Sequence, residues 1–164
     1  MRKNHTILIF MLSAIVLFSA FSRLEDPEQV PYPTGYRSWT HVKSKVAMSS
    51  NPSNKNSSTY HHIYANDLAL QGYKTGKFPK GSIIVADFIA AVDSSAALFE
   101  GQRKYIDVMI RNTEQYANTG GWGFEEFDKD SKTARKVNLV NAQACFNCHK
   151  SQAANEFVFS KYRE

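Results

Sequence analysis

The chain holds two cysteines, and both lie in the run Cys145-Phe146-Asn147-Cys148-His149. A Cys-x-x-Cys-His run is typical of the attachment site of a c-type haem. The two thiols add to the porphyrin vinyl groups as thioethers, and the imidazole that follows is the proximal axial ligand of the iron. The run therefore predicts one covalently attached haem c, bound through Cys145 and Cys148, with His149 as the metal ligand.

Two other uses of the cysteine pair fit the sequence less well. A structural zinc site needs four nitrogen or sulfur ligands, and no second cysteine pair is present to complete it. A thioredoxin-like redox pair would follow an early strand of a βαβ unit, whereas this pair lies close to the C-terminus. Haem attachment is the favoured interpretation.

The N-terminus has the pattern of an export signal. Arg2, Lys3 and His5 precede an apolar run from Ile7 to Phe21, which matches a basic region followed by a hydrophobic region. The run is shorter than the roughly 20 apolar residues that span a bilayer. We expect a signal peptide at residues 1–22 and a single domain at residues 23–164, in the bacterial periplasm or otherwise exported. The alternative is an uncleaved signal anchor that tethers the domain to the membrane.

The net charge of +5 includes two cations of the predicted signal, so the remaining domain is only mildly basic. It has no dense cluster of lysine and arginine, which argues against nucleic-acid binding. A mildly basic rim could still steer small anions or an acidic redox partner protein.

The elements that must position the haem motif can be outlined from residue patterns. We expect a short helix at 36–46, a helix starting at Asn66 or Asp67, and a C-terminal helix at 137–150 that carries the motif. Segments rich in β-branched and aromatic residues predict strands at 60–64, 82–90, 105–111 and 122–127. The expected fold class is α+β, mainly an antiparallel sheet with flanking helices.

The position of the motif bears on the sixth iron ligand. Neither methionine nor histidine follows His149, so a second protein ligand would have to come from upstream. The candidates are Met48, Met109, His41, His61 and His62. His61 and His62 are adjacent and would face opposite sides of a strand, so at most one could reach the iron. An open distal site is the better interpretation.

Four short motifs, in this order along the chain, resemble the cytochrome P460 and cytochrome c′-beta family: Tyr36-Arg37-Ser38-Trp39, Phe78-Pro79-Lys80-Gly81-Ser82, Gly121-Trp122-Gly123-Phe124 and the run CFNCHK that begins at Cys145. The resemblance implies a mostly antiparallel β fold with helices, a homodimer, and a single c-type haem whose distal face is vacant. Members of the family oxidise hydroxylamine, or bind nitric oxide and related small gases.

One departure from the family pattern concerns a lysine. In cytochrome P460 proper, a lysine on the strand after the Phe-Pro turn forms an extra covalent bond to the porphyrin, and a carboxylate follows it. This sequence has Ala86 and Asp87 at those positions, so the cross-link should be missing. If Ala86 faces the haem, Ile84 and Phe88 share that face and line an apolar distal pocket, or serve as ordinary core residues.

Several charged residues are further candidates for the site. Asp87, Asp107, Glu125 and Glu126 are carboxylates that could act as a base, although Asp87 should point away from the haem. Glu125 and Glu126 are weak catalytic candidates, and a solvated strand face is their expected position. Arginine side chains commonly bind haem propionates, and the sequence offers three equal candidates: Arg37, Arg103 and Arg111.

These observations leave three hypotheses of function. The first is a periplasmic mono-haem cytochrome that binds nitric oxide, carbon monoxide or related gases, similar to cytochrome c′-beta. The second is a hydroxylamine-oxidising enzyme similar to cytochrome P460. The third is a six-coordinate electron carrier. The missing lysine favours the first over the second, and the missing downstream ligand disfavours the third.

Overall fold

The structure is a computed structural model that describes residues 29–48, 58–94, 96–137 and 139–163. The predicted signal peptide at residues 1–22 lies outside the described residues. Within the described part of the chain, no helix is long and apolar enough to cross a membrane.

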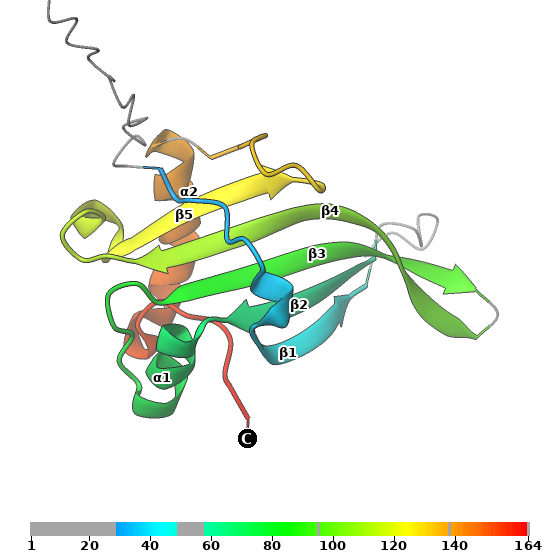
Figure 1. Cartoon of the computed structure of the whole chain (residues 1–164), viewed down its shortest axis with the longest axis horizontal. Helices are drawn as coiled ribbons and strands as arrows, with labels where there is room; N and C mark the ends of the chain where they lie inside the picture. The colour runs from blue at the N-terminus through cyan, green and yellow to red at the C-terminus, as the bar shows by residue number, and fades with distance from the viewer. Residues whose placement is uncertain (1–28, 49–57, 95, 138, 164) are drawn as a thin grey trace, which may run out of the picture.

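The centre of the fold is one antiparallel sheet of five strands that follow one another in chain order, β1-β2-β3-β4-β5 (Figure 1). Neighbouring strands are consecutive in sequence, so each connection is a hairpin or a short excursion. The strands are β1 (Thr40–Ala47), β2 (Thr59–Ala65), β3 (Ile83–Ser94), β4 (Ala97–Arg111) and β5 (Trp122–Asp128).

Helices flank this sheet. One of them, α1 (Asp67–Thr75), has a capped N-terminus. The side chain of Asn66 accepts a hydrogen bond from the Ala69 amide at 2.9 Å, as an N-cap does. The same oxygen accepts a second bond from the Ile83 amide at 3.0 Å, which ties α1 to the start of β3. The other helical elements are η1 (Tyr36–Ser38), η3 (Ala117–Thr119), α2 (Leu139–His149) and η4 (Lys150–Asn155).

The two faces of the sheet bury different clusters. On one face, α2 and the segment after it cover a cluster that includes Ile84, Met109 and Phe124. On the other face, the N-terminal segment runs across the strands and covers Val85, Ile106 and neighbouring side chains (Figure 1). Because strand residues alternate between faces, strands β2 to β5 contribute to both clusters, and β1 contributes Val42 to the first.

The structure confirms the mainly antiparallel sheet with flanking helices, and it places Cys145 and Cys148 in the C-terminal helix α2. The expected helix at 36–46 is wrong, because only the turn η1 forms there and β1 follows it. Thr40, Val42 and Val46 are β-branched, and pairing with β2 outweighs the weak helical pattern of this segment.

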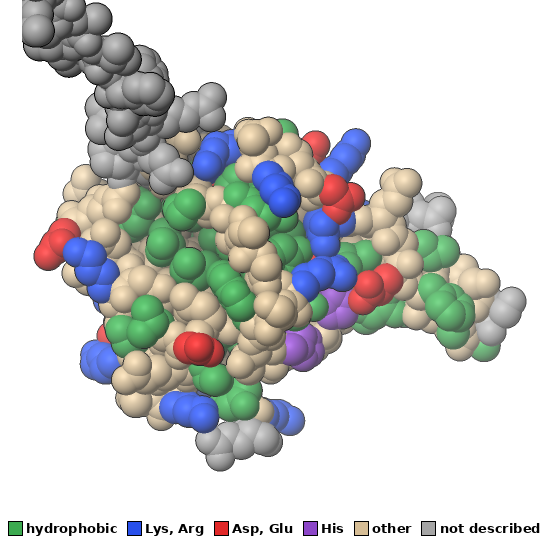
Figure 2. All heavy atoms as spheres, in the orientation of Figure 1, with side chains coloured by type: hydrophobic (Ala, Val, Ile, Leu, Met, Phe, Trp, Pro, Cys, Tyr) green, Lys and Arg blue, Asp and Glu red, His purple; other side chains and the backbone are tan. Residues whose placement is uncertain are grey.

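Strands β3 and β4 are both longer than the sequence predicted. Beyond Ala91 they form a two-stranded arm that projects past the rest of the sheet (Figure 1). The arm presents the apolar side chains of Val92, Leu98 and Phe99 to solvent (Figure 2).

Candidate functional site

A cavity of about 320 Å³ lies between the sheet and the helix that carries the Cys-x-x-Cys-His run. This volume is in the range of cofactor and small-molecule sites. The wall on one side comes from α2 and the segment after it, and the opposite wall comes from all five strands. The residues that line the cavity include Lys43, Lys45, His61, Ile63, Ile84, Ala86, Phe88, Asp107, Met109, Phe124, Glu125, Glu126, Cys145, His149 and Phe159.

Helix α2 brings the residues of the motif to this cavity. Cys145 and His149 are four residues apart and therefore lie on one face of the helix, and both line the cavity. Cys148 lies beside them and is exposed. The helix therefore presents two cysteine sulfur atoms and one imidazole at the edge of a mainly apolar cavity.

The imidazole of His149 is held by its own hydrogen bond. Its Nδ1 lies 2.7 Å from the backbone carbonyl oxygen of Phe157, so Nδ1 carries the proton and Nε2 carries the lone pair. The rings of Phe124 and Phe159 pack against it with centroids 5.1 and 4.9 Å away. Burial lowers the pKa of His149 below its ordinary value. A neutral, fixed imidazole of this kind is what a metal ligand requires.

The strand alternation expected for β3 determines the opposite wall. Ile84, Ala86 and Phe88 all line the cavity, and the side chain of Asp87 is fully buried on the other face. Ala86 pairs with Ile63 of β2 and with Asp107 of β4, so it lies near the middle of the sheet. The structure thus brings these residues and His149 together around one cavity, while their role as a distal pocket stays a prediction.

Two of the five candidates for a sixth ligand, His61 and Met109, line the cavity. His61 Nε2 lies 2.8 Å from the hydroxyl of Thr59, and its ring contacts Phe88 at a centroid distance of 4.2 Å. Burial, with a smaller effect of the nearby Lys45 charge, lowers the pKa of His61 to about 4. His61 is therefore neutral at pH 7.

The other three candidates lie elsewhere. His62 faces the opposite side of the sheet, where its Nε2 lies 2.9 Å from Glu100, as strand geometry requires for a neighbour of His61. His41 is exposed and contacts Ser44. Met48 is 70% exposed at the end of β1.

Asp107 has surroundings in the cavity that could not be predicted from the sequence. Asp107 lies on β4 opposite Ala86 and lines the cavity. Burial, with a smaller contribution from the charge of Glu126, raises the pKa of Asp107 to about 7. A carboxyl group that titrates near neutral pH can accept or release a proton under physiological conditions.

The two weak catalytic candidates, Glu125 and Glu126, line the same cavity but are held differently. Glu125 is buried rather than solvated, and its carboxylate accepts bonds from Arg135 and the Val137 amide, each at 3.0 Å. Glu126 is partly exposed and pairs with Lys136 at 3.3 Å. Glu125 therefore has a structural role as a hydrogen-bond acceptor. Glu126 instead contributes, through its negative charge, to the raised pKa of Asp107.

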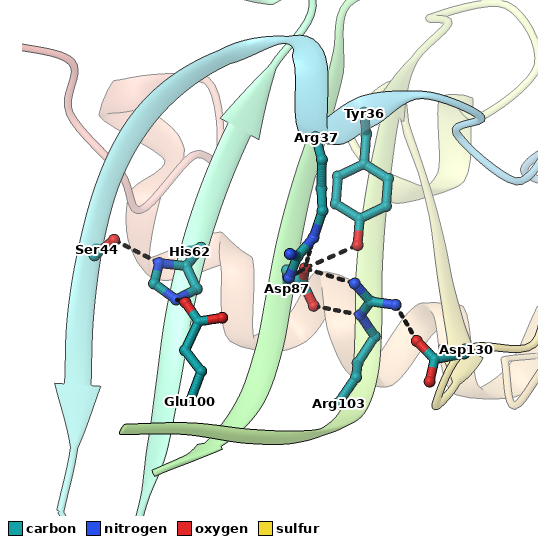
Figure 3. A network of polar contacts seen from close by, with 8 residues as sticks. All are labelled: Tyr36, Arg37, Ser44, His62, Asp87, Glu100, Arg103 and Asp130. Atoms are coloured by element: carbon teal, nitrogen blue, oxygen red, sulfur yellow. Dashed lines mark hydrogen bonds and ion pairs between the residues drawn. The ribbon is translucent and has the colours of Figure 1, made fainter. Parts of the chain in front are cut away.

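Asp87 stands at the centre of a separate network on the far face (Figure 3). The hydroxyl of Tyr36 donates to Asp87 at 2.8 Å, Arg37 Nη2 donates at 2.7 Å, and Arg103 Nε donates at 2.7 Å. Burial alone would raise the pKa of Asp87, but the bonds from Arg103 and Arg37 outweigh it and hold the pKa below the ordinary value. The Tyr36-Arg37 motif thus attaches the N-terminal segment to the sheet.

The three arginines that were candidates for binding the haem propionates have other partners. Arg37 and Arg103 bind Asp87, and Arg111 binds Glu156 and the Gly120 carbonyl. None of these three side chains is among the described residues that line the cavity. The cations that do line it are Lys43 and Lys45 of β1, which the sequence reasoning missed because it assigned this segment to a helix.

A sheet wall lined mainly by apolar side chains, facing a helix with paired thiols and a fixed imidazole, is the arrangement of a haem-type cytochrome. A family model described as Cytochrome P460 matches residues 33–160. The chain belongs to the cytochrome P460 family, as the resemblance of its motifs predicted, and family membership implies a haem cofactor. No curated protein matches the chain.

Proposed function

We propose that this protein is an exported cytochrome with one covalently attached haem c and an open distal site that binds nitric oxide or related small gases. The observation that carries the proposal is the pair of facing cavity walls. One wall contains His149, whose Nδ1 donates a hydrogen bond to a backbone carbonyl, and the other is an apolar strand surface. When bound, the haem supplies an iron that coordinates a small ligand and changes oxidation state.

The donor set of the cavity fits a haem. Cys145 and Cys148 would form the thioethers, and His149 would ligate the iron through Nε2. Lys43 and Lys45 would pair with the propionates, because they are the cations on the cavity wall. In the described part of the chain, no three histidine, cysteine or acidic side chains cluster in a way that could hold a metal ion by themselves. A porphyrin iron needs only one or two protein ligands.

The apolar wall supports a preference for neutral ligands. Ile84, Ala86 and Phe88 offer neither a hydrogen-bond donor nor a charge, and an alanine occupies the position of the cross-linking lysine. A surface of this kind excludes water and favours diatomic gases over charged ligands. Tryptic peptide mass spectrometry tests the missing cross-link: the peptide that contains Ala86 should have its unmodified mass.

A second candidate function, hydroxylamine oxidation, is favoured by one specific observation. Asp107 lines the cavity, and its pKa of about 7 suits a group that accepts protons from a substrate. In that case Asp107 would take the proton released as hydroxylamine is oxidised, and an external acceptor would take the electrons.

Spectroscopy of the purified holoprotein tests the proposal. A high-spin, five-coordinate ferrous spectrum that changes on addition of carbon monoxide or nitric oxide supports it. A low-spin, six-coordinate spectrum contradicts it and supports the electron carrier, with His61 or Met109 as the sixth ligand. His61→Ala and Met109→Leu then identify that ligand, and hydroxylamine-dependent reduction of an added dye supports the oxidase.

Export and assembly are part of the same proposal. We place the protein in the bacterial periplasm, with membrane tethering through an uncleaved anchor as the alternative, and N-terminal sequencing of the mature protein separates the two. We also propose a homodimer, for which the apolar side chains exposed on the β3–β4 arm are a suitable surface. Light scattering during size-exclusion chromatography measures the mass. A redox partner protein that exchanges electrons with the haem is part of the proposal.

A further inference from the structure

The segment after α2 contains two consecutive residues in the left-handed backbone region. Glu156 has φ of 53° and Phe157 has φ of 67°. Side chains with a Cβ atom, and bulky ones in particular, rarely adopt this conformation, and it persists only where surrounding contacts impose it. The turn directs the Phe157 carbonyl to His149 Nδ1 at 2.7 Å.

Contacts to Glu156 hold this turn from three directions. Its carbonyl accepts a hydrogen bond from the Trp122 indole at 2.8 Å. Its carboxylate accepts from Arg111 Nη2 at 3.0 Å and from Lys77 Nζ at 2.8 Å. The Arg111 and Glu156 side chains are only 12% and 20% exposed, so this pair is shielded from solvent, whereas Lys77 is mostly exposed.

Arg111 is itself fixed in place. Its Nη1 donates to the Gly120 carbonyl at 2.6 Å, and its guanidinium lies 5.3 Å from the centroid of the Trp122 ring. Gly121 leaves the space that this arrangement needs, since a Cβ atom there would lie 2.8 Å from Arg111 Nη1. The position of Glu156 is therefore determined by the end of β4 and the start of β5.

We infer that Glu156 is a positioning residue for the proximal histidine. Held by Arg111 and Trp122, it fixes the turn that keeps the Phe157 carbonyl on His149 Nδ1. A hydrogen bond at Nδ1 makes the imidazole a stronger electron donor to a metal at Nε2. Glu156 thereby strengthens the bond between iron and histidine and lowers the reduction potential. This inference rests on the proposed function, because it requires His149 to be the axial ligand.

The test compares Glu156→Ala and Glu156→Gln with the wild-type holoprotein. The readouts are the iron–histidine stretching band of the ferrous protein and the midpoint potential. Glu156→Ala should shift the band to lower frequency and raise the potential. Glu156→Gln should shift both in the same direction by less, because its amide oxygen still accepts a bond from Arg111. Glu114→Gln is the matched control, since Glu114 pairs with Lys80 on the exposed surface, and it should change neither readout.

The possible results distinguish the positioning role of Glu156 from the proposed function on which that role rests. A wild-type protein without an iron–histidine band removes the proposed function and the inference with it. A wild-type protein that has the band, together with a folded Glu156→Ala protein whose band and potential are unchanged, overturns the positioning role alone. Should circular dichroism show that Glu156→Ala does not fold, Glu156→Gln decides, and unchanged readouts in that variant overturn the role.

Discussion

The network around Asp87 predicts a large loss of stability without a loss of ligand binding. Asp87→Asn removes a charge whose side chain is fully buried and leaves Arg103, only 16% exposed, facing a neutral amide. Breaking one partner out of a buried ion pair costs about 3–5 kcal/mol. We expect the lower end, about 3 kcal/mol, because Arg103 keeps its bond to Asp130 and Arg37 is half exposed.

For a domain of this size, that loss lowers the melting temperature by roughly 6–12 °C. Thermal unfolding of the holoprotein at pH 7 measures it, with Glu114→Gln as a surface control that should melt at the wild-type temperature. The ferrous spectrum and its response to nitric oxide should be unchanged, because Asp87 lies on the face away from the cavity. A variant that melts like the wild type, or binds nitric oxide differently, would refute the reasoning.

The pH dependence follows from the direction of the pKa shift. A carboxylate whose pKa is lowered by folding stabilises the native state above its unfolded pKa, and this contribution disappears as the pH falls through the native pKa. The lowered pKa of Asp87 therefore places part of the acid denaturation below about pH 4. Asp87→Asn should be less stable than the wild type at pH 7, and the difference should narrow in acid.

Three further predictions concern the cavity and its support. Asp107 has a pKa raised to about 7, so wild-type stability should fall by up to a few kcal/mol between about pH 4 and 7, and denaturant titrations should show a weaker decline for Asp107→Asn. Phe88→Ala removes the ring stacked on Tyr105 at 4.4 Å and should raise the nitric oxide association rate several-fold in stopped-flow measurements; an unchanged rate would mean that Phe88 does not restrict access. Gly72→Ala would place a Cβ atom 2.2 Å from the Phe78 ring, and the overpacking should cost about 1–3 kcal/mol, measured as a lower melting temperature, despite the better helix propensity of alanine.

Strand alternation was the most informative feature of the sequence. The resemblance put Ala86 at the haem-facing position, and strand geometry then put Asp87 on the opposite face, which is where the structure has both residues. A one-residue slip would exchange the two faces and turn Asp87 into the cavity. The helical spacing of residues 137–150 also correctly predicted the helix that carries the motif, α2. The first inference combined strand geometry with the family resemblance, and the second used the residue pattern of a single segment.

Features that arise from tertiary contacts could not be predicted in the same way. The pKa of Asp107 depends on its burial in the cavity wall and on the charge of Glu126, which lies on a different strand. The His149 hydrogen bond depends on a turn at Glu156 that no glycine marks. Strand β1 was mistaken for a helix because its partner strand, β2, supplies most of the reason for its extended conformation.

Strand β1 is an edge strand of the sheet, so its lysines have a second effect, on aggregation. An edge strand offers unpaired backbone groups to other molecules, and lysines on it hinder intermolecular strand addition. Lys43 and Lys45 lie on that edge and also face the cavity. Neutralising them would therefore remove a barrier against aggregation together with the proposed propionate partners, and the yield of soluble protein must be measured before any loss of colour is attributed to weaker cofactor retention.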